Sequence, residues 1–171
     1  GRSEMGQDVY TSLSMLLAEE LAVDPRKIKV LHAPADPAYV NAVFGAQITG
    51  GSTSIREGWV PLRTAGATAR EMLVAAAAAK WGVSPADCRA ANGMVTHAAH
   101  HATYGSLAAA AANLPVPKDV VLKDPAKFTV IGKPLARLDG ADKARGRTTY
   151  GLDVMRPGML YAAIAPCPVI G

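Results

Sequence analysis

The feature that most constrains the fold is a run of apolar and small residues that repeats with helical spacing after residue 54. Its members follow one another at alternating steps of four and three residues: Ile55, Trp59, Leu62, Gly66, Ala69, Leu73 and Ala76. This spacing places them on one face of a helix that continues to about Trp81. Because the stripe contains a glycine and alanines, we expect the helix to pack very closely against another element.

The start of this helix allows more than one cap. Ser54 and Glu57 have the spacing of a capping box, while Thr53 or Ser52 could be the N-cap instead. Pro61 lies near the beginning of the helix and predicts a kink close to its first two turns.

Shorter elements are predicted on both sides of the long helix. Apolar residues at helical spacing predict a helix over residues 9–21, and an alanine-rich helix is expected over residues 104–112. Asn92-Gly93 predicts a two-residue hairpin turn, and Ser84-Pro85 predicts a single capped turn. Short strands are expected over residues 28–31, 128–131, 148–154 and 160–165.

Composition narrows the class of protein. Half of the 171 residues are hydrophobic, enough for one core, but only 5% are aromatic. Since alanine buries little area, we expect the chain to pack against further protein, as a segment cut from a longer one would. The net charge of +4 is too small and scattered to indicate nucleic-acid binding. The densest basic stretch is interrupted by acidic residues and predicts a solvated face: Arg137, Lys143, Arg145 and Arg147.

Candidate metal and membrane features are weak. Cys88 and Cys167 lie far apart, so they cannot hold an iron–sulfur cluster or a structural zinc by themselves. His97, His100 and His101 have alanine neighbours and no nearby acidic residue, which favours a polar turn over a metal site. No apolar run approaches the roughly 20 residues that span a bilayer.

Two glycine-bearing segments, each directly before a helix, predict an anion site. They are Glu4-Met5-Gly6-Gln7 and Thr49-Gly50-Gly51-Ser52-Thr53-Ser54. A helix start offers unpaired N–H groups, glycine admits a close anion, and the hydroxyls and the Gln7 amide add donors. We therefore expect both segments to face one cavity. Ordinary helix starts with a connecting loop are the alternative interpretation.

Further motifs occur in order along the chain. They are Ser3 to Gln7 with Val9-Tyr10-Thr11, His32 to Tyr39, Thr49 to Ser54, Ile131 to Pro134, and Pro157 to Tyr161. Together they resemble the molybdopterin-binding large subunit of the xanthine dehydrogenase and aldehyde oxidase superfamily. Within it they most resemble the isoquinoline 1-oxidoreductase β-subunit group, whose members include membrane-associated aldehyde dehydrogenases. The resemblance covers essentially all of the chain.

The resemblance implies a cofactor and the residues that bind it. In this family the Gly-Gln motif and the glycine–serine–threonine loop hold molybdopterin cytosine dinucleotide. The matching positions here are Gly6, Gln7, Gly50, Gly51, Ser52, Thr53 and Ser54. The family usually has a glycine after the glutamine, where this chain has Asp8. A carboxylate at that position should repel a phosphate unless its side chain turns away or caps the next helix.

The resemblance also implies a reaction that this chain does not complete. The family hydroxylates aldehydes or N-heterocycles with water as the oxygen source and a glutamate as general base. We expect no catalytic or metal-ligating residue in this chain. The implied partners are the remainder of the large subunit, a small subunit with two [2Fe–2S] clusters, and a cytochrome c as electron acceptor. Family members commonly carry a twin-arginine signal and work in the periplasm or at the membrane. The alternative is a non-catalytic, truncated scaffold that binds partners through its alanine-rich stripe.

The expected fold class is α+β. Residues 1–120 are expected to form part of a molybdopterin-binding domain in which helices pack with short strands. A linker over residues 121–127 should follow, and residues 128–171 should begin an α/β hammerhead-like module.

Overall fold

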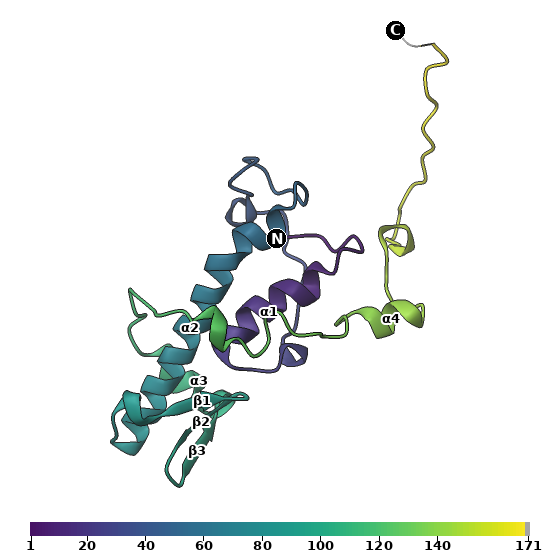
Figure 1. The fold of residues 1–171 in the computed structure, drawn as a ribbon. Helices are drawn as coiled ribbons and strands as arrows, with labels where there is room; N and C mark the ends of the chain where they lie inside the picture. The colour runs from purple at the N-terminus through teal and green to yellow at the C-terminus, as the bar shows by residue number, and fades with distance from the viewer. Residues whose placement is uncertain (170–171) are drawn as a thin grey trace. The chain divides into compact units, whose positions relative to one another are not determined.

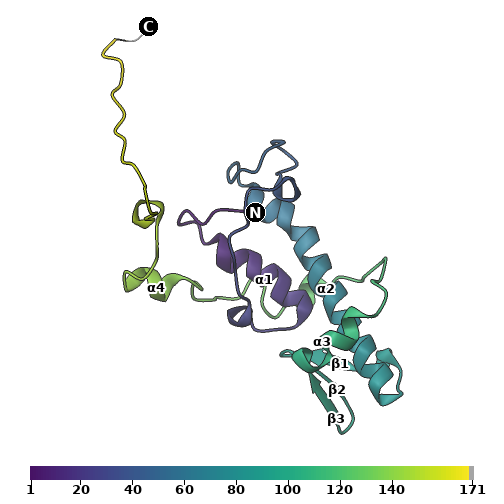
Figure 2. The same ribbon diagram turned by 180° about the vertical axis from the view of Figure 1, so that it is seen from behind.

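The computed structural model describes residues 1–169, whose contacts fall into two compact units, Gly1–Asp139 and Gly140–Gly171. In the first unit two helices lie against each other, and a small sheet and a third helix pack on the C-terminal half of the longer one (Figures 1 and 2). Its helices and strands are α1 (Val9–Leu21), α2 (Thr53–Trp81), β1 (Arg89–Ala91), β2 (Met94–His97), β3 (His100–Thr103) and α3 (Tyr104–Ala112). The α+β class is confirmed.

The predicted long helix is α2, which has 29 residues, and the close packing expected along it is confirmed at Gly66. A Cβ atom at Gly66 would lie 2.6 Å from the carbonyl oxygen of Leu17 and 3.1 Å from the backbone nitrogen of Leu21, both in α1. Only glycine lets the two backbones approach this closely. At Gly66 the stripe is therefore covered by α1.

Not every residue of the predicted stripe is buried. Gly66, Leu73 and Ala76 are buried, whereas Ile55, Trp59, Leu62 and Ala69 are half-buried. The buried face changes along α2 because the helix meets two neighbours in succession, first α1 and then α3 with the sheet.

The start of α2 differs from the predicted capping box. Ser52 is the N-cap, and its side chain forms no capping hydrogen bond. Glu57 instead pairs with Arg2 and accepts a hydrogen bond of 3.3 Å from the N–H of Val43. Pro61 lies inside the helix, as predicted.

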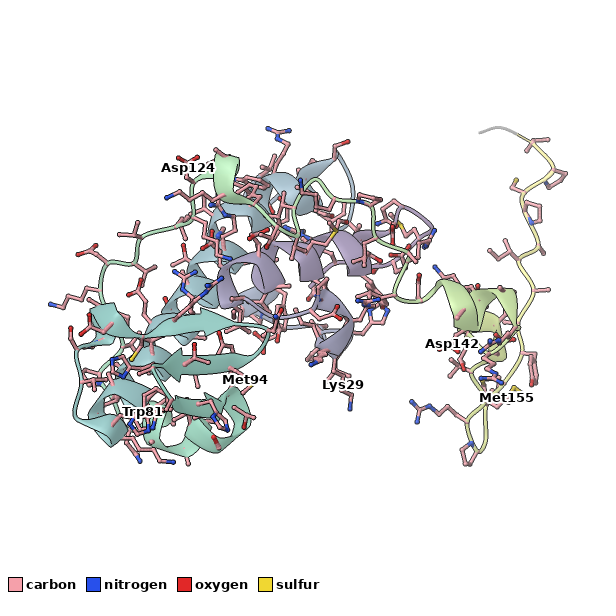
Figure 3. The ribbon with its side chains drawn as sticks, turned by 60° about the horizontal axis from the view of Figure 1, so that its bottom comes forward. Lys29, Trp81, Met94, Asp124, Asp142 and Met155 are labelled. Atoms are coloured by element: carbon pink, nitrogen blue, oxygen red, sulfur yellow. The ribbon has the colours of Figure 1, made fainter. Side chains whose placement is uncertain are left out.

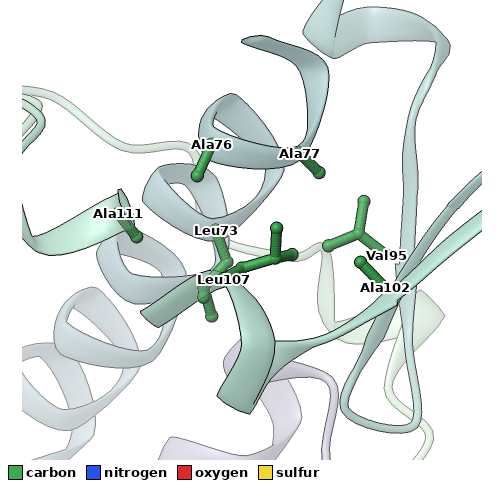
Figure 4. Packing of buried hydrophobic residues seen from close by; sticks show 7 residues of the cluster. All are labelled: Leu73, Ala76, Ala77, Val95, Ala102, Leu107 and Ala111. Atoms are coloured by element: carbon green, nitrogen blue, oxygen red, sulfur yellow. The ribbon is translucent and has the colours of Figure 1, made fainter. Parts of the chain in front are cut away.

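The C-terminal half of α2 carries the apolar core of this unit (Figure 4). Leu73, Ala76 and Ala77 face α3 and the sheet, and their partners are Val95, Ala102, Leu107 and Ala111. The sheet has the antiparallel order β1-β2-β3, with Ala91 opposite Met94. Asn92 and Gly93 both have positive φ, 51° and 78°, as a tight hairpin turn requires. The predicted hairpin is confirmed.

The histidines flank the turn between β2 and β3, because His97 ends β2 and His100 and His101 begin β3. His97 pairs with His100 at the end of the β2–β3 hairpin. The ring of Trp81, which is labelled in Figure 3, stacks on His100 at a centroid distance of 5.5 Å. Within residues 1–169, no group of three or more His, Cys, Asp or Glu side chains is arranged to hold a metal ion. Cys88 and Cys167 are both free thiols.

Four short 3-10 turns in the first unit share one local cause. Each begins with an Asp-Pro or Ser-Pro pair, whose acidic or hydroxyl side chain accepts from the N–H two residues later. At the turn that Asp124 begins, labelled in Figure 3, this bond to Ala126 is 2.9 Å. The turns are Pro25–Lys27, Pro37–Tyr39, Pro85–Asp87 and Pro125–Lys127. The capped turn expected after Ser84 is thus confirmed.

The strands expected outside the hairpin are wrong. Residues 28–31 are extended without a strand partner. The N–H groups of Thr129, Val130 and Ile131 donate to the carboxylate of Glu19 rather than to another strand. The segment predicted as linker and strand is therefore held on α1.

The second unit contains one short helix, α4 (Gly140–Ala144), and a 3-10 turn, Gly151–Asp153, among its described residues. No strand forms between residues 140 and 169, although the sequence predicts strands over 148–154 and 160–165. An extended segment becomes a strand only when a neighbouring strand accepts its hydrogen bonds, and this part of the described chain offers none. Across residues 1–169, no helix has both the length and the hydropathy needed to cross a bilayer.

Candidate functional site

The two glycine-bearing segments line one cavity of about 400 Å³ in the first unit. Figures 1 and 2 both place the N-terminal segment beside the start of α2. The lining residues are Met5, Gln7, Val9, Ser12, Thr49, Gly50, Ser52, Ser54 and Ile55. The expectation that the segments face one cavity is confirmed. None of these lining residues carries a charge, so an anion here would meet neutral donors only.

Volume does not single out this cavity. Cavities of about 550 to 650 Å³ lie elsewhere in the same unit, and none of them includes a residue of either glycine segment. The pocket between the segments differs in its chemistry, because a helix start opens into it.

Hydrogen bonds join the residues immediately before the first segment to those at the beginning of the second. The N–H of Ser3 donates to the hydroxyl of Thr49 at 2.8 Å, and the guanidinium of Arg2 donates to the carbonyl of Ile48 at 2.7 Å. Arg2 also forms an ion pair with Glu57 on α2. The distance between the walls of the pocket is therefore set by specific bonds across 46 or more residues of sequence.

The start of α2 is open. Within residues 1–169, the backbone N–H groups of Ser52, Ser54 and Ile55 donate to no protein acceptor. Unpaired N–H groups in a first helical turn carry a positive partial charge and bind anions. All three of these residues line the pocket, together with the uncapped hydroxyl of Ser52.

The start of α1 is closed, which corrects the symmetrical interpretation of the two helix starts. The carboxylate of Glu4 accepts hydrogen bonds from the N–H groups of Gly6 at 2.8 Å, Asp8 at 3.1 Å and Tyr10 at 3.2 Å. Glu4 thus fills with its own charge the position that an anionic ligand would take. The sequence offered one signal for this role, an acidic residue shortly before a helix.

Gln7 lies in the pocket wall with most of its amide engaged. Its Oε1 accepts from the N–H of Met5 at 2.6 Å, and its Nε2 donates to the carbonyl of Ser3 at 2.9 Å. Since an amide NH₂ has two hydrogens, one donor of Gln7 is left for a ligand. The side chain mainly holds its own loop in shape.

The remaining predicted residues lie outside the pocket lining. Gly6, Gly51 and Thr53 do not line the cavity. Gly6 and Gly51 have φ of 104° and 59°, and a Cβ at Gly51 would lie 2.8 Å from the ring of Phe44. The buried hydroxyl of Thr53 donates to the carbonyl of Gly50 at 2.8 Å and accepts from Asn41 at 2.7 Å. Sequence reasoning missed Asn41 as the buried support of this loop, because its partner lies 12 residues away.

Asp8 turns towards Arg137 and does not cap α1. It is the N-cap residue of α1 with φ of 65°, and its side chain forms no capping bond. Its Oδ1 lies 3.6 Å from Nε of Arg137. Arg137 also contacts Glu4 and Asp139. The hydrogen bond with Asp139, together with the charges of Asp139, Asp8 and Glu4, raises the pKa of Arg137 above its usual value. Arg137 is thus ion-paired with three carboxylates, while its side chain remains 34% exposed.

The chain matches a known protein family. The profile of the molybdopterin cofactor-binding domain matches residues 1–156. The chain is 33% identical to the β-subunit of isoquinoline 1-oxidoreductase of Brevundimonas diminuta, in an alignment that covers 98% of this chain and 26% of that protein. It is 31% identical to a membrane-bound aldehyde dehydrogenase (pyrroloquinoline-quinone) of Gluconacetobacter polyoxogenes, over 94% of this chain and 21% of that protein.

A third relative also aligns with this chain over only a small part of its own length. A nicotinate dehydrogenase subunit of Pseudomonas putida is 30% identical over 100% of this chain and 14% of its own length. The chain thus spans between 14% and 26% of these three curated relatives. Both glycine segments and the pocket between them lie within the matched region. This chain belongs to the molybdopterin cofactor-binding domain family.

Proposed function

We propose that the pocket between the two glycine segments binds the phosphate-bearing part of molybdopterin cytosine dinucleotide. The observation that carries the proposal is the open start of α2: Ser52, Ser54 and Ile55 line the cavity, and within residues 1–169 their backbone N–H groups have no protein acceptor. An uncharged wall with several donors suits a phosphate, because nothing in it repels the anion.

The predicted site residues then divide into two roles. Ser52 and Ser54 donate to the cofactor, Gly50 admits its close approach, and Gln7 offers its remaining amide hydrogen. Gly6, Gly51 and Thr53 maintain the backbone that presents these donors. When bound, the cofactor supplies the redox centre for hydroxylation of an aldehyde or N-heterocycle with oxygen from water. This chain contributes the binding wall, and we assign none of its residues a catalytic or metal-ligating role.

We further propose that the chain acts within the large subunit of a molybdenum hydroxylase. Two of its relatives are named as single subunits of oxidoreductases, which supports partner chains. The proposed partners are the remainder of the large subunit, a small subunit with [2Fe–2S] clusters, and a cytochrome c. The membrane-bound relative supports a periplasmic or membrane-associated location. We also propose residues 1–120 as the cofactor-binding part, residues 121–127 as a linker, and residues 128–171 as the start of a hammerhead-like module.

Gly50 offers a direct test in the full-length subunit that contains this chain. A side chain at Gly50 meets nothing within 4 Å and needs no unusual backbone angle, so Gly50→Asp can fold. Its carboxylate lies before the start of α2, where a negative charge favours the helix but repels a phosphate. We expect molybdenum per subunit, measured by mass spectrometry, to fall at least about tenfold, the effect of roughly 1.4 kcal/mol of repulsion.

Gly50→Asn is the matched control, because it has the same shape without the charge and should retain most of the molybdenum. Acid hydrolysis of the wild-type protein should release cytidine monophosphate in proportion to molybdenum. Equal molybdenum in the Asp and Asn variants would remove the pocket from the cofactor site. Release of another nucleotide would overturn the cytosine form alone.

A further inference from the structure

We propose that Arg137 is a positioning residue for the cofactor pocket, which it serves by neutralising the carboxylates on either side of the Gly6-Gln7 loop and by holding that loop. This inference rests on the proposed function and adds to it a residue outside both glycine segments. No motif of the sequence marks it, since Arg137 lies 131 positions from the loop that it contacts.

Arg137 holds the loop at several points at once. Its guanidinium donates to the carbonyl of Gly6 at 3.1 Å and to the carboxylate of Glu4 at 3.1 Å. Its Nε lies 3.6 Å from Asp8 Oδ1 and 3.2 Å from Asp139 Oδ1. Residues on both sides of Gln7 are thus bound by one side chain. Arg137 thereby holds the loop that carries Gln7, while the Gln7 amide itself is bonded to Met5 and Ser3.

The negative charges of Asp8 and Glu4 explain why a cation is needed at position 137. Asp8 stands in the sequence between Gln7 and Val9, which both line the pocket. Its Oδ1 is buried and forms no hydrogen bond, and within residues 1–169 its ion pair is with Arg137. Together with Glu4, which closes the start of α1, Asp8 places two negative charges on the loop that carries Gln7, a residue of the pocket that is to receive an anion. Arg137 is placed to offset them.

A backbone hydrogen bond next to Arg137 fixes its position beside the Gly6-Gln7 loop. The N–H of Leu138, the next residue, donates to the buried hydroxyl of Thr11 on α1 at 3.0 Å. Residues 129–131 are bonded to Glu19 near the end of α1, and Leu138 is bonded to Thr11 in its first turn. Arg137 therefore reaches the Gly6-Gln7 loop from a fixed position. An arginine suits the task because its fork can bond a carbonyl and carboxylates together.

The test is a double-mutant cycle between Arg137 and Asp8 in the full-length subunit with its partners. We expect Arg137→Gln to lower molybdenum per subunit at least fivefold, because the carboxylate of Asp8 is then uncompensated. Asp8→Gly fits the backbone, since φ of 65° suits glycine, and it removes that charge. In the Arg137→Gln background, Asp8→Gly should restore at least half of the wild-type molybdenum. Arg145→Gln, in the second unit, is the control and should keep its molybdenum.

Each other outcome contradicts the proposal. Full molybdenum in Arg137→Gln would show that the arginine is not needed, and a loss that Asp8→Gly does not restore would show a purely structural role. If Arg137→Gln does not fold, the double variant is compared with Asp8→Gly alone: equal molybdenum supports charge compensation, and a fivefold lower content overturns it. Loss in Gly50→Asp with no loss in Arg137→Gln would reject this inference while leaving the pocket assignment intact.

Discussion

Asp8 and Ser52 have the same unusual backbone conformation immediately before α1 and α2, with φ of 65° and 53°. A residue with a side chain adopts this region at a cost on the order of 1 kcal/mol. An N-cap residue normally has an extended backbone that aims its side chain at the first turn. Neither Asp8 nor Ser52 forms a side-chain capping bond. Both helix starts are therefore left for another group, which is Glu4 for α1 and a ligand in our proposal for α2.

At the same scale, adjacent glycines should respond differently to an added methyl group. Gly51 has φ of 59°, and its Cβ would lie 2.8 Å from the Phe44 ring, whereas Gly50 has open space. We expect Gly51→Ala to lower the free energy of unfolding of this unit by about 1–3 kcal/mol. Gly50→Ala should change it by less than about 0.5 kcal/mol. Chemical denaturation followed by circular dichroism measures both. A Gly51→Ala variant as stable as Gly50→Ala would contradict the strained turn.

At the scale of elements, the contact between α1 and α2 depends on the absence of a side chain at Gly66. The backbones meet where a Cβ at that position would lie 2.6 Å from a carbonyl oxygen of α1. Backbone atoms cannot rotate away as a side chain can, so the two helices would have to separate. Alanine is a better helix former than glycine. In Gly66→Ala the gain in helix propensity and the loss of packing therefore change the free energy of unfolding in opposite directions.

Matched substitutions in α2 and α3 separate these two effects. We expect Gly66→Ala to destabilise the unit by about 1–3 kcal/mol, because overpacking outweighs the gain in helix propensity. Gly105→Ala in α3, where nothing lies within 4 Å of the added atom, should be neutral or stabilise by up to about 1 kcal/mol. Thermal unfolding of the two variants side by side is the measurement. Equal behaviour would mean that α1 and α2 adjust to the methyl group without loss.

Sequence periodicity predicted these elements well and their partners poorly. The helices at residues 9–21 and 104–112 and the Asn92-Gly93 turn are confirmed because their causes act within a few residues. The capping box at Ser54 and Glu57 is wrong because Arg2, far away in sequence, takes the glutamate. Local patterns cannot report such a competitor.

At the scale of the first unit, two buried glutamates at the end of α1 hold the distant segment near residue 123. Glu20 accepts from Arg63 at 2.9 Å and from the N–H of Lys123 at 3.1 Å. Glu19 accepts from Lys123 Nζ at 3.0 Å and from Val130 N–H at 2.6 Å. Burial would raise the pKa of Glu19, but hydrogen bonds from Val130, Lys123 and Ile131 outweigh it and lower that pKa below 4.5. These contacts of Glu19 and Glu20 fix the segment of the chain that precedes Arg137.

The lowered pKa predicts that the contacts of Glu19 are sensitive to acid. A carboxyl whose pKa is lower in the folded state stabilises the fold above its unfolded pKa, near 4.5, and this stabilisation is lost as the pH falls through the folded value. We expect the amides of residues 129–131 to lose hydrogen-exchange protection as the pH falls below 4.5 and through the folded pKa of Glu19, after correction for intrinsic rates. Glu19→Gln should lower their protection at pH 7 by tenfold or more, and Glu71→Gln, the control on α2, should not. Unchanged protection in Glu19→Gln would show that other contacts hold the segment.

Local sequence patterns were enough to predict α1, α2, α3, the hairpin turn and the two glycine segments of the pocket, because helical spacing and turn chemistry act over short distances. Only the tertiary structure decided which helix start is open. Glu4 closes α1 through three N–H groups, while Ser52 leaves α2 uncapped. It also decided that residues 129–131 bond to Glu19 instead of forming a strand, and that Arg137 bonds to the Gly6-Gln7 loop. These outcomes depend on which distant groups compete for the same donors and charges, and that competition is settled only when the chain is folded.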